Sequence, residues 1–393
     1  MPDVAVPRPT RRPRVLFVAP WVPSERRPRS LALLRHLRAV AEVRCVVTAW
    51  DALDRADAAR LGADVVVVRA RGAAGVLRAG AGLLRGASLQ QAYADAPAVR
   101  RAIRREVVGF RPDFAYFNVI RSAQWFDEVG DLPVVHDLDE VRSDYYRQRA
   151  QSAAGLSRLV ARVESRRMAT AERRAAARAG TVLVSSPVDA AHADPGRVVV
   201  LRSEHVMAAA TWTEREAVPG RLLFVGRLGY DANVEALEWF VARVLPLLRE
   251  RGLAVRLRIV GAEAGPRVER LVAPDVELVG RVPDVGAEYA AAQAVVVPVR
   301  TATGVQMKFI EALSVGSPTV STPVCARLAG AGAADACLVA DAPGEWADAI
   351  ERLLGSAAVR DGLSAAGRAW TAAAYGGDTA ATLRDVLTAA RRA

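Results

Sequence analysis

Long apolar runs are missing from the sequence, and no stretch approaches the 18 uninterrupted apolar residues of a transmembrane helix. Cysteine is scarce: Cys45, Cys325 and Cys337 are odd in number, widely spaced and in contexts that favour strands. This excludes a disulfide framework and a zinc site, and it favours buried free thiols in a reducing cytoplasm. Residues 1–14 are rich in proline and arginine and lack the apolar segment of a secretory signal. We therefore expect a cytoplasmic protein.

Lysine and asparagine are nearly absent. Lys308 is the single lysine among 54 basic residues, and the two asparagines are Asn118 and Asn233. This skew, with the abundance of alanine, is typical of GC-rich coding sequence, so the net charge of +11 does not by itself indicate a polyanionic partner. Aromatic residues are not interleaved with the arginines, which argues against nucleic-acid binding. A lone lysine in an arginine-rich chain indicates a specific role.

What is present indicates a globular α/β protein of about two domains. Of the 393 residues, 52% are hydrophobic and 25% charged, which excludes a disordered or collagen-like chain. Continuous apolar runs alternate with amphipathic helical stretches, the pattern of parallel strands covered on both faces. In the first half the expected strands are 15–19, 43–48, 64–68, 113–117, 133–137, 181–184 and 197–201. In the second half they are 222–225, 255–260, 276–279, 294–299, 318–321 and 337–340.

Two sets of such strands predict two doubly wound, Rossmann-like domains facing each other across a cleft. The first domain is expected over 14–202 and the second over 221–375, joined by a polar linker at 203–220. An alanine-rich helix over 376–393 is expected to pack back toward the first domain. Since ligands of parallel sheets bind beyond the carboxyl ends of the strands, the chemistry should follow the strands directly.

The segment after the first strand lacks G-x-G-x-x-G, which argues against a dinucleotide-dependent dehydrogenase or epimerase. Ser30 is expected to cap a helix that begins at Leu31. Arg29 would then lie at the mouth of the cleft, either as a solvated loop charge or as a contact to a ligand.

The strand 133–137 ends in His136 and Asp137. A histidine at a strand end can bond a substrate hydroxyl or transfer a proton, and the alternative is a buried structural histidine. Asp137 and Asp139 also match a D-x-D metal pattern. Two carboxylates without a third ligand support metal binding only weakly.

Arginines recur at helical spacing over 155–180, with Leu156, Leu159, Val160 and Val163 on another face of the expected helix. One interpretation is the solvated face of a packed helix. The other is electrostatic docking on anionic lipid headgroups.

The second domain opens with a strand that runs into Gly226 and Arg227, followed by a helix capped near Asn233. Arg227 is placed to meet an anion such as a phosphate beside a helix N-terminus. For Asn233 we expect the capping role.

Residues 298–323 carry the richest pattern: a glycine loop, then a short helix from about Gly304 that ends at Gly316. The amides of Gly304, Val305 and Gln306 would form an anion cradle, with Lys308 adding charge one turn in. Glu311, on the same helical face, could accept from two ribose hydroxyls. The alternative is a surface salt bridge between Lys308 and Glu311.

These blocks carry a family resemblance. They comprise Arg29-Ser-Leu-Ala-Leu-Leu-Arg-His-Leu, Phe224-Val-Gly-Arg-Leu, Asn233-Val-Glu-Ala-Leu-Glu-Trp-Phe, Gly304-Val-Gln-Met-Lys-Phe-Ile-Glu-Ala-Leu and Gly316-Ser-Pro-Thr-Val-Ser-Thr-Pro. The chain resembles GT-B fold glycosyltransferases of family 4, in particular sugar transferases of bacterial exopolysaccharide and secondary-metabolite clusters. The resemblance implies transfer of a sugar from a nucleotide diphosphate donor to a hydroxyl of a glycan, lipid-linked or small-molecule acceptor. It further implies retention at the anomeric carbon, and neither a metal nor another cofactor.

The resemblance also implies residue roles. Glu311 would be the second acid of the family's E-x7-E pair and hold the donor ribose, Arg227 and Lys308 would hold the diphosphate, and His136 would face the transferred sugar. Two positions depart from the family pattern, since Thr303 replaces the first acid and Ala232 replaces a lysine. We therefore expect altered contacts to the donor sugar.

Two other functions stay open at this point. One is a non-enzymatic protein that binds a membrane surface or nucleic acid, and the other is a GT-B-like nucleotide-sugar epimerase. The arginine-rich helix adds the expectation of peripheral contact with the inner face of the plasma membrane.

Overall fold

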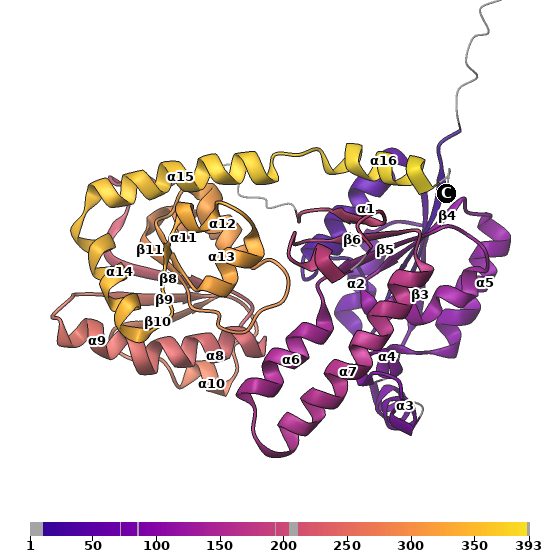
Figure 1. Ribbon diagram of the computed structural model, residues 1–393, viewed down its shortest axis with the longest axis horizontal. Coiled ribbons are helices and arrows are strands. Elements are labelled where there is room, and N and C mark those ends of the chain that lie inside the picture. The colour runs from indigo at the N-terminus through magenta and orange to yellow at the C-terminus, as the bar shows by residue number, and fades with distance from the viewer. Residues whose placement is uncertain (1–10, 71, 85, 193, 204–210, 391–393) are drawn as a thin grey trace, which may run out of the picture. The chain divides into compact units, whose positions relative to one another are not determined.

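The computed structural model describes residues 11–70, 72–84, 86–192, 194–203 and 211–390 (Figure 1). These residues form two compact units. Unit 1 comprises the chain up to Ser185, Asp189–Arg202 and the residues from Asp378 onward. Unit 2 comprises Ser186–Val188 and Ser203–Gly377.

Unit 1 is built on a seven-stranded parallel sheet in the order β3-β2-β1-β4-β5-β6-β7. Its strands are β1 (Arg14–Ala19), β2 (Glu42–Ala49), β3 (Val65–Arg69), β4 (Phe114–Asn118), β5 (Val134–Asp139), β6 (Thr181–Val184) and β7 (Val198–Val200). Each coincides within a few residues with an apolar run of the sequence, because a strand covered on both faces excludes polar side chains from most positions.

Helices cover both faces of this sheet. They are α1 (Pro28–Val40), α2 (Ala52–Arg60), α3 (Gly72–Leu84), α4 (Leu89–Ala94), α5 (Pro97–Phe110), η1 (Ile120–Val129), α6 (Arg142–Ser152), α7 (Gly155–Arg178), η2 (Asp189–His192) and α16 (Thr379–Ala390). The last helix, α16, packs against α1 and contributes Leu383, Val386 and Leu387 to the apolar core on one face of the sheet (Figure 1). Unit 1 is therefore completed by the far end of the chain.

Unit 2 has a six-stranded parallel sheet in the order β10-β9-β8-β11-β12-β13. Its strands are β8 (Val218–Val225), β9 (Arg256–Val260), β10 (Val276–Gly280), β11 (Ala292–Val297), β12 (Thr319–Ser321) and β13 (Leu338–Val339). Its helices are α8 (Asp231–Trp239), η3 (Phe240–Val244), α9 (Leu245–Glu250), α10 (Pro266–Glu269), α11 (Val285–Ala291), α12 (Met307–Val315), α13 (Pro323–Ala329), η4 (Ala333–Ala336), α14 (Pro343–Gly355) and α15 (Ala357–Tyr375).

In both parallel sheets, the order in which successive strands are added reverses at one point. In unit 1 the strands progress outward from β1 on one side and from β4 on the other, and in unit 2 from β8 and β11. The connections on the two sides of such a point leave in opposite directions and open a crevice at the carboxyl ends of the central strands, where doubly wound sheets bind ligands. The prediction of two doubly wound domains is confirmed.

Two details differ from the sequence prediction. Cys325 lies in helix α13 rather than in a strand, although all three cysteines are buried and free. The expected linker is shorter, since Trp212 is buried in the core of unit 2 and β8 begins at Val218; residues 204–210 lie outside the described residues. In the described part of the chain, no helix is long and apolar enough to span a membrane.

Candidate functional site

In unit 2, the loops that follow β8 and β11 meet at the switch point of the sheet. Gly226 directly follows β8. Lys308 is the second residue of α12, the helix that follows β11. A Cβ at position 226 would lie 3.1 Å from Lys308 Cε and 2.8 Å from Asn233 Nδ2. A side chain there would displace the lysine stem, so this glycine is required by close approach. The fold thus brings Arg227, which follows Gly226, and Lys308 to the same strand-end region.

Lys308 is buried rather than exposed. Its side chain runs over the Phe224 ring, 5.8 Å from Nζ to the ring centroid, and Nζ donates to Gln306 Oε1 at 3.2 Å. Burial lowers the pKa of the ammonium. The alternative of a surface salt bridge with Glu311 is wrong, because the described residues show no ion pair between the two. A buried cation with one neutral hydrogen-bond partner has charge available for an anion.

Glu311 is held by a tyrosine that the sequence patterns did not indicate. The Tyr289 hydroxyl contacts Glu311 Oε2 at 3.0 Å and the Lys308 carbonyl at 3.2 Å, and its ring is fully buried. Burial raises the pKa of Glu311, while the Tyr289 bond and the charge of Lys308 act to lower it. Tyr289 therefore fixes the orientation of the Glu311 carboxylate, which the resemblance assigns to the donor ribose.

Arg227 is the exposed cation of the site. Its side chain is 65% exposed, and Nε donates to Glu263 Oε2 at 2.6 Å. An ion pair this exposed contributes little stability and opens at small cost. The guanidinium can therefore exchange Glu263 for a phosphate, whose oxygens match its bidentate geometry.

Asn233 does not cap α8 as expected. The helix begins at Asp231 with Tyr230 at the N-cap, so Asn233 lies in its first turn. It is buried, and its Nδ2 donates to the Arg227 carbonyl at 2.9 Å. The amide fixes the Arg227 loop instead of ending the helix, because its side chain points back toward β8.

The glycine loop after β11 is longer than predicted. Gly304 adopts a φ of +69°, a left-handed conformation that favours glycine, and α12 begins at Met307 rather than near Gly304. Gln306 is the N-cap residue and makes no side-chain cap bond to the helix. The first turn of α12 therefore has no side-chain cap, although the Phe309 amide donates to the Gln306 carbonyl at 2.9 Å. The anion cradle at Gly304, Val305 and Gln306 stays a prediction.

In unit 1, Arg29 is neither a solvated charge nor exposed at a strand end. It lies inside α1 with 11% of its side chain exposed, and it pairs with Asp137 at 2.7 Å and with Asp139 at 3.0 Å. Its Nη1 also donates to the Leu201 carbonyl at 2.9 Å, which ties α1 to β5 and to the end of β7. Because Arg29 neutralises both carboxylates of the D-x-D pattern, this pair does not fit a metal site.

Ser30 is not an N-cap. Pro28 starts the helix at its first position, where a missing N–H costs nothing, and the N-cap is Arg27. Ser30 Oγ instead donates to Asn118 Oδ1 at 2.7 Å and accepts from Trp21 Nε1 at 3.0 Å. Asn118 Nδ2 in turn donates to Asp137 Oδ2 at 2.8 Å. This chain of bonds links the loop after β1 and helix α1 to the carboxyl ends of β4 and β5.

His136 is buried in β5, edge-on to the Phe126 ring at a centroid distance of 5.2 Å. Burial lowers its pKa to about 4, only partly offset by a hydrogen bond with the Val119 backbone. Nε2 has no hydrogen-bond partner among the described residues. Val119 itself has a φ of +60°, a strained conformation for a β-branched residue. His136 is thus a neutral imidazole with one unused nitrogen.

Asp189 lies in an acidic cluster beyond β5 and gives a prediction for stability. Burial, then the charges of Glu140, Asp139, Asp144 and Glu172, raise its pKa to about 7. A raised carboxyl pKa means that the folded protein binds the extra proton between about pH 4 and pH 7, so stability falls as pH rises through this window.

We expect Asp189→Asn to recover roughly 2–4 kcal/mol of unfolding free energy at pH 8 and little at pH 4. Urea titrations at both pH values measure the difference. The exposed Asp194→Asn serves as the control. Equal effects of Asp189→Asn at pH 4 and pH 8 would contradict the assignment.

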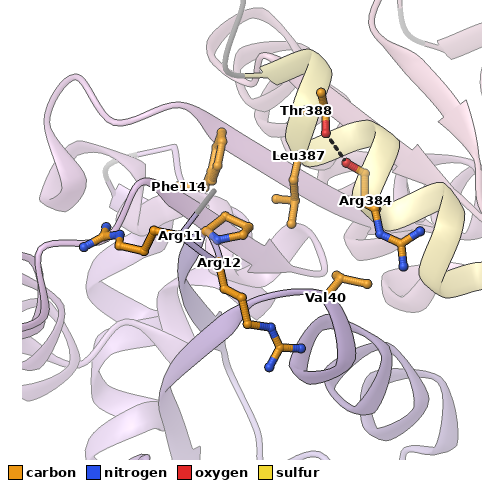
Figure 2. A pocket seen from close by; sticks show the side chains of 8 residues that line it. Arg11, Arg12, Val40, Phe114, Arg384, Leu387 and Thr388 are labelled. Atoms are coloured by element: carbon orange, nitrogen blue, oxygen red, sulfur yellow. Dashed lines mark hydrogen bonds between the residues drawn. The ribbon is translucent and has the colours of Figure 1, made fainter. Parts of the chain in front are cut away.

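A pocket of about 390 Å³ in unit 1 lies away from these strand ends (Figure 2). It is lined by Arg11, Arg12, Pro13, Val40, Phe114, Arg384, Leu387 and Thr388. Pro13 precedes β1 and Phe114 begins β4, so the pocket lies at the amino ends of the strands, opposite the edge where parallel sheets bind ligands. Arg11 pairs with Asp113, and Arg12 bonds the carbonyl of Ala39. We assign it no part in the site.

With this geometry established, comparisons with known proteins become informative. Residues 219–356 match the family model described as glycosyl transferases group 1, which covers the sheet of unit 2 and both switch-point loops. Unit 2 carries a glycosyl transferases group 1 domain. A search of curated proteins gives no match.

Solved structures extend the likeness to both units. HepE of Anabaena in complex with UDP and glucose is 14% identical, with a TM-score of 0.62 over 94% of this chain and 97% of that one. Sucrose-phosphate synthase of Thermosynechococcus elongatus is 16% identical, with a TM-score of 0.66 over 93% and 95%. WaaG, a glycosyltransferase of lipopolysaccharide biosynthesis, is 17% identical, with a TM-score of 0.58 over 95% and 99%. The fold is that of GT-B glycosyltransferases.

Two residues of the candidate site, Tyr289 and Glu263, could not be found from the sequence patterns. Tyr289 is 22 positions from Glu311, and Glu263 is 36 positions from Arg227. Neither belongs to a motif, and no periodicity marks them. Glu263 reaches the site because it follows β9, the neighbour of β8, and Tyr289 reaches it because α11 packs against α12.

Proposed function

We propose that the switch point of unit 2 binds a nucleoside diphosphate sugar. The observation that carries this is the buried ammonium of Lys308, which donates to the neutral Gln306 Oε1, beside the first turn of α12, where no side chain caps the helix. Arg227 and Lys308 would bind the diphosphate with the amides of Gly304, Val305 and Gln306. Glu311 would accept from the ribose hydroxyls. HepE was solved with UDP and with UDP-glucose, which supports a uridine nucleotide as the first candidate.

In the proposed reaction the acceptor hydroxyl oxygen bonds to the anomeric carbon, and the bond from that carbon to the diphosphate oxygen breaks. The hydroxyl proton passes to water, and the diphosphate departs with an additional negative charge, so that atoms and charge balance. Lys308 and Arg227 stabilise that charge as it grows, which lowers the barrier. The two cations supply the neutralisation, so we propose a reaction without a divalent ion. Retention and the family number remain predictions of the resemblance.

The donor proposal is tested by thermal shift of the full chain with UDP, GDP and dTDP and their sugars. At least one nucleotide should raise the melting temperature. Glu311→Ala should weaken binding of that nucleotide by about 1.5–3 kcal/mol, or roughly 10–150-fold, because it removes charge-assisted hydrogen bonds. Since ribose stays uncharged through the reaction, the variant should raise the donor KM far more than it lowers kcat.

The matched control is Glu351→Ala, which removes an exposed carboxylate on α14 of the same unit. It should leave nucleotide binding unchanged. If none of the nucleotides shifts the melting temperature of the wild-type protein, or if Glu311→Ala binds as tightly as the control, the assignment of the donor site is wrong.

We also propose that the first half of α7 docks on an anionic membrane. The apolar residues expected to pack are instead exposed: Leu156 by 75%, Leu159 by 59%, Val160 by 44% and Val163 by 36%. Exposed arginines lie among them on the same helix, namely Arg158, Arg162 and Arg166. Apolar side chains flanked by cations complement an anionic lipid surface, the location of a lipid-linked acceptor.

Vesicle co-sedimentation tests the docking surface. Binding should rise with the fraction of phosphatidylglycerol and fall with salt. The double variant Leu156→Ser, Leu159→Ser should weaken binding at least about 10-fold, since each leucine buries apolar area worth about 1.5–3 kcal/mol. Leu53→Ser, which alters an exposed leucine on α2, is the control. Equal binding to neutral vesicles, or no binding to any, would contradict the proposal.

A further inference from the structure

A second cationic site lies in unit 1, at the switch point between β1 and β4. Trp21 follows β1, and Arg121 follows β4 in η1. The Arg121 guanidinium carbon lies 4.6 Å from the centroid of the Trp21 ring, and that of Arg27 lies 5.5 Å from it. Two cations therefore contact one aromatic ring in the crevice where a doubly wound sheet binds its ligand.

The two neighbouring arginines of this site have carboxylate partners. Arg27 pairs with the buried Asp54 at 2.8 Å, and Arg142 pairs with Glu140 at 2.5 Å. Arg121 differs, because no carboxylate of the described residues lies within ion-pair distance of it. Among the described residues, its guanidinium contacts the uncharged Trp21 ring.

The surroundings of Arg121 make this lack of a partner costly. Burial and then the charge of Arg142 lower its pKa to about 10, and the Glu140 carboxylate offsets this only in part. A guanidinium that loses water without gaining a carboxylate raises the free energy of the folded protein. A protein keeps such a group where a ligand supplies the missing charge.

The Trp21 ring is also held in place. Its Nε1 donates to Ser30 Oγ, which donates to Asn118, which donates to Asp137. The platform under the two guanidinium groups is thus fixed by a continuous set of hydrogen bonds that ends on the Arg29 ion pair. A preorganised cation loses little entropy when it binds an anion.

We infer that Arg121 binds an anionic group of the acceptor, a phosphate ester or a carboxylate, at the switch point of unit 1. The planar guanidinium suits the paired oxygens of either group. This goes beyond the donor site, since it concerns the other substrate and other residues. It also selects among acceptors: a neutral sugar or a neutral aglycone lacks the group that Arg121 requires.

The test titrates the full chain with three probes at constant ionic strength: inorganic phosphate, glucuronate and glucose. UDP is present throughout at saturation, so that cations of the donor site are occupied. Phosphate or glucuronate should raise the melting temperature, and glucose should not. A response to phosphate alone indicates a phosphorylated acceptor, and a response to glucuronate alone indicates an acidic sugar.

Three variants assign the effect to Arg121. Arg121→Gln should weaken anion binding at least about 10-fold, the loss of a charge-assisted bidentate contact. Arg121→Lys should bind with intermediate strength, because the charge stays and the planar fork is lost. Arg35→Gln, which removes an exposed arginine of α1, changes the net charge equally and should bind as wild type.

A second readout separates binding from a structural role. Without ligand, Arg121→Gln should melt at the same or a higher temperature than wild type, because it removes an uncompensated charge. A lower melting temperature, unchanged anion binding in Arg121→Gln, or equal binding of glucose would overturn the inference. Failure of UDP to bind would contradict the proposed donor site in unit 2 and leave the inference about Arg121 standing. Both variants change unit 1 only, so their unit 2 is identical to that of the wild type.

Discussion

Lys308→Ala should lower kcat by about 10²–10³-fold, the scale of losing one preorganised group that stabilises developing charge. The ammonium lies beside the proposed diphosphate, whose negative charge grows as the glycosidic bond breaks. Because burial already lowers the pKa of this lysine, its removal should not destabilise the fold. Steady-state kinetics and the melting temperature together measure both effects.

Lys308→Arg is the sharper variant. The pocket between Gly226, Phe224 and Gln306 fits a compact ammonium, and a guanidinium is larger and differently oriented. Arginine should therefore restore little activity, although the chain uses it at every other basic position. Arg300→Ala is the control, since Arg300 lies in the same loop and is 43% exposed. Full activity of Lys308→Ala would refute the proposed diphosphate site. Full activity of Lys308→Arg would show that the only lysine of the chain has no role that arginine cannot fill.

His136→Gln should lower turnover by roughly 10²-fold or more, the usual contribution of a positioned proton-transfer or hydrogen-bonding group. Nε2 is the one imidazole nitrogen without a partner among the described residues, and we propose that it contacts the transferred sugar. With a pKa of about 4, the imidazole stays neutral above pH 5, so its titration should produce no limb in kcat/KM between pH 5 and pH 7.

The control separates chemistry from packing. Because His136 is buried against Phe126, truncation to alanine would cost stability as well as activity. Phe126→Leu keeps the imidazole and disturbs only its packing, so it should lower the melting temperature with turnover per folded molecule retained. If His136→Gln lowers the melting temperature as much and retains turnover, the histidine is structural.

The strands could be predicted because burial on both faces imposes continuous apolar runs, such as 294–299 against the observed β11. Lys308 stood out by composition alone, and Gly304 by its place after a strand. These signals are local: they depend on a residue and its neighbours in the chain. They sufficed for the fold class and for the two loops at the switch point of unit 2, where we propose the donor site.

What could not be predicted depends on tertiary contacts. A serine at a helix start favours a cap, yet Pro28 moved the start of α1 and freed Ser30 for Asn118, 88 positions away. The sequence predicted Arg29 as a solvated loop charge or a ligand contact, and its ion pair with Asp137 depends on the packing of α1 against β5. The apolar residues of α7 were interpreted as a face that packs against the protein. No pattern within the helix indicated that Leu156 would be exposed.

The place of α16 has a consequence for synthesis. Leu383 and its neighbours belong to the core of unit 1, beside Leu33 and Leu34 of α1, so that core cannot close before residue 390 has left the ribosome. Unit 2 consists of the continuous segment Ser203–Gly377 and the three earlier residues Ser186–Val188. It can therefore fold as its last helix leaves the ribosome. Domains usually fold in the order of their synthesis. In this chain the core of unit 1 is completed only after unit 2 has been synthesised, and a chain truncated before Leu383 leaves that core open.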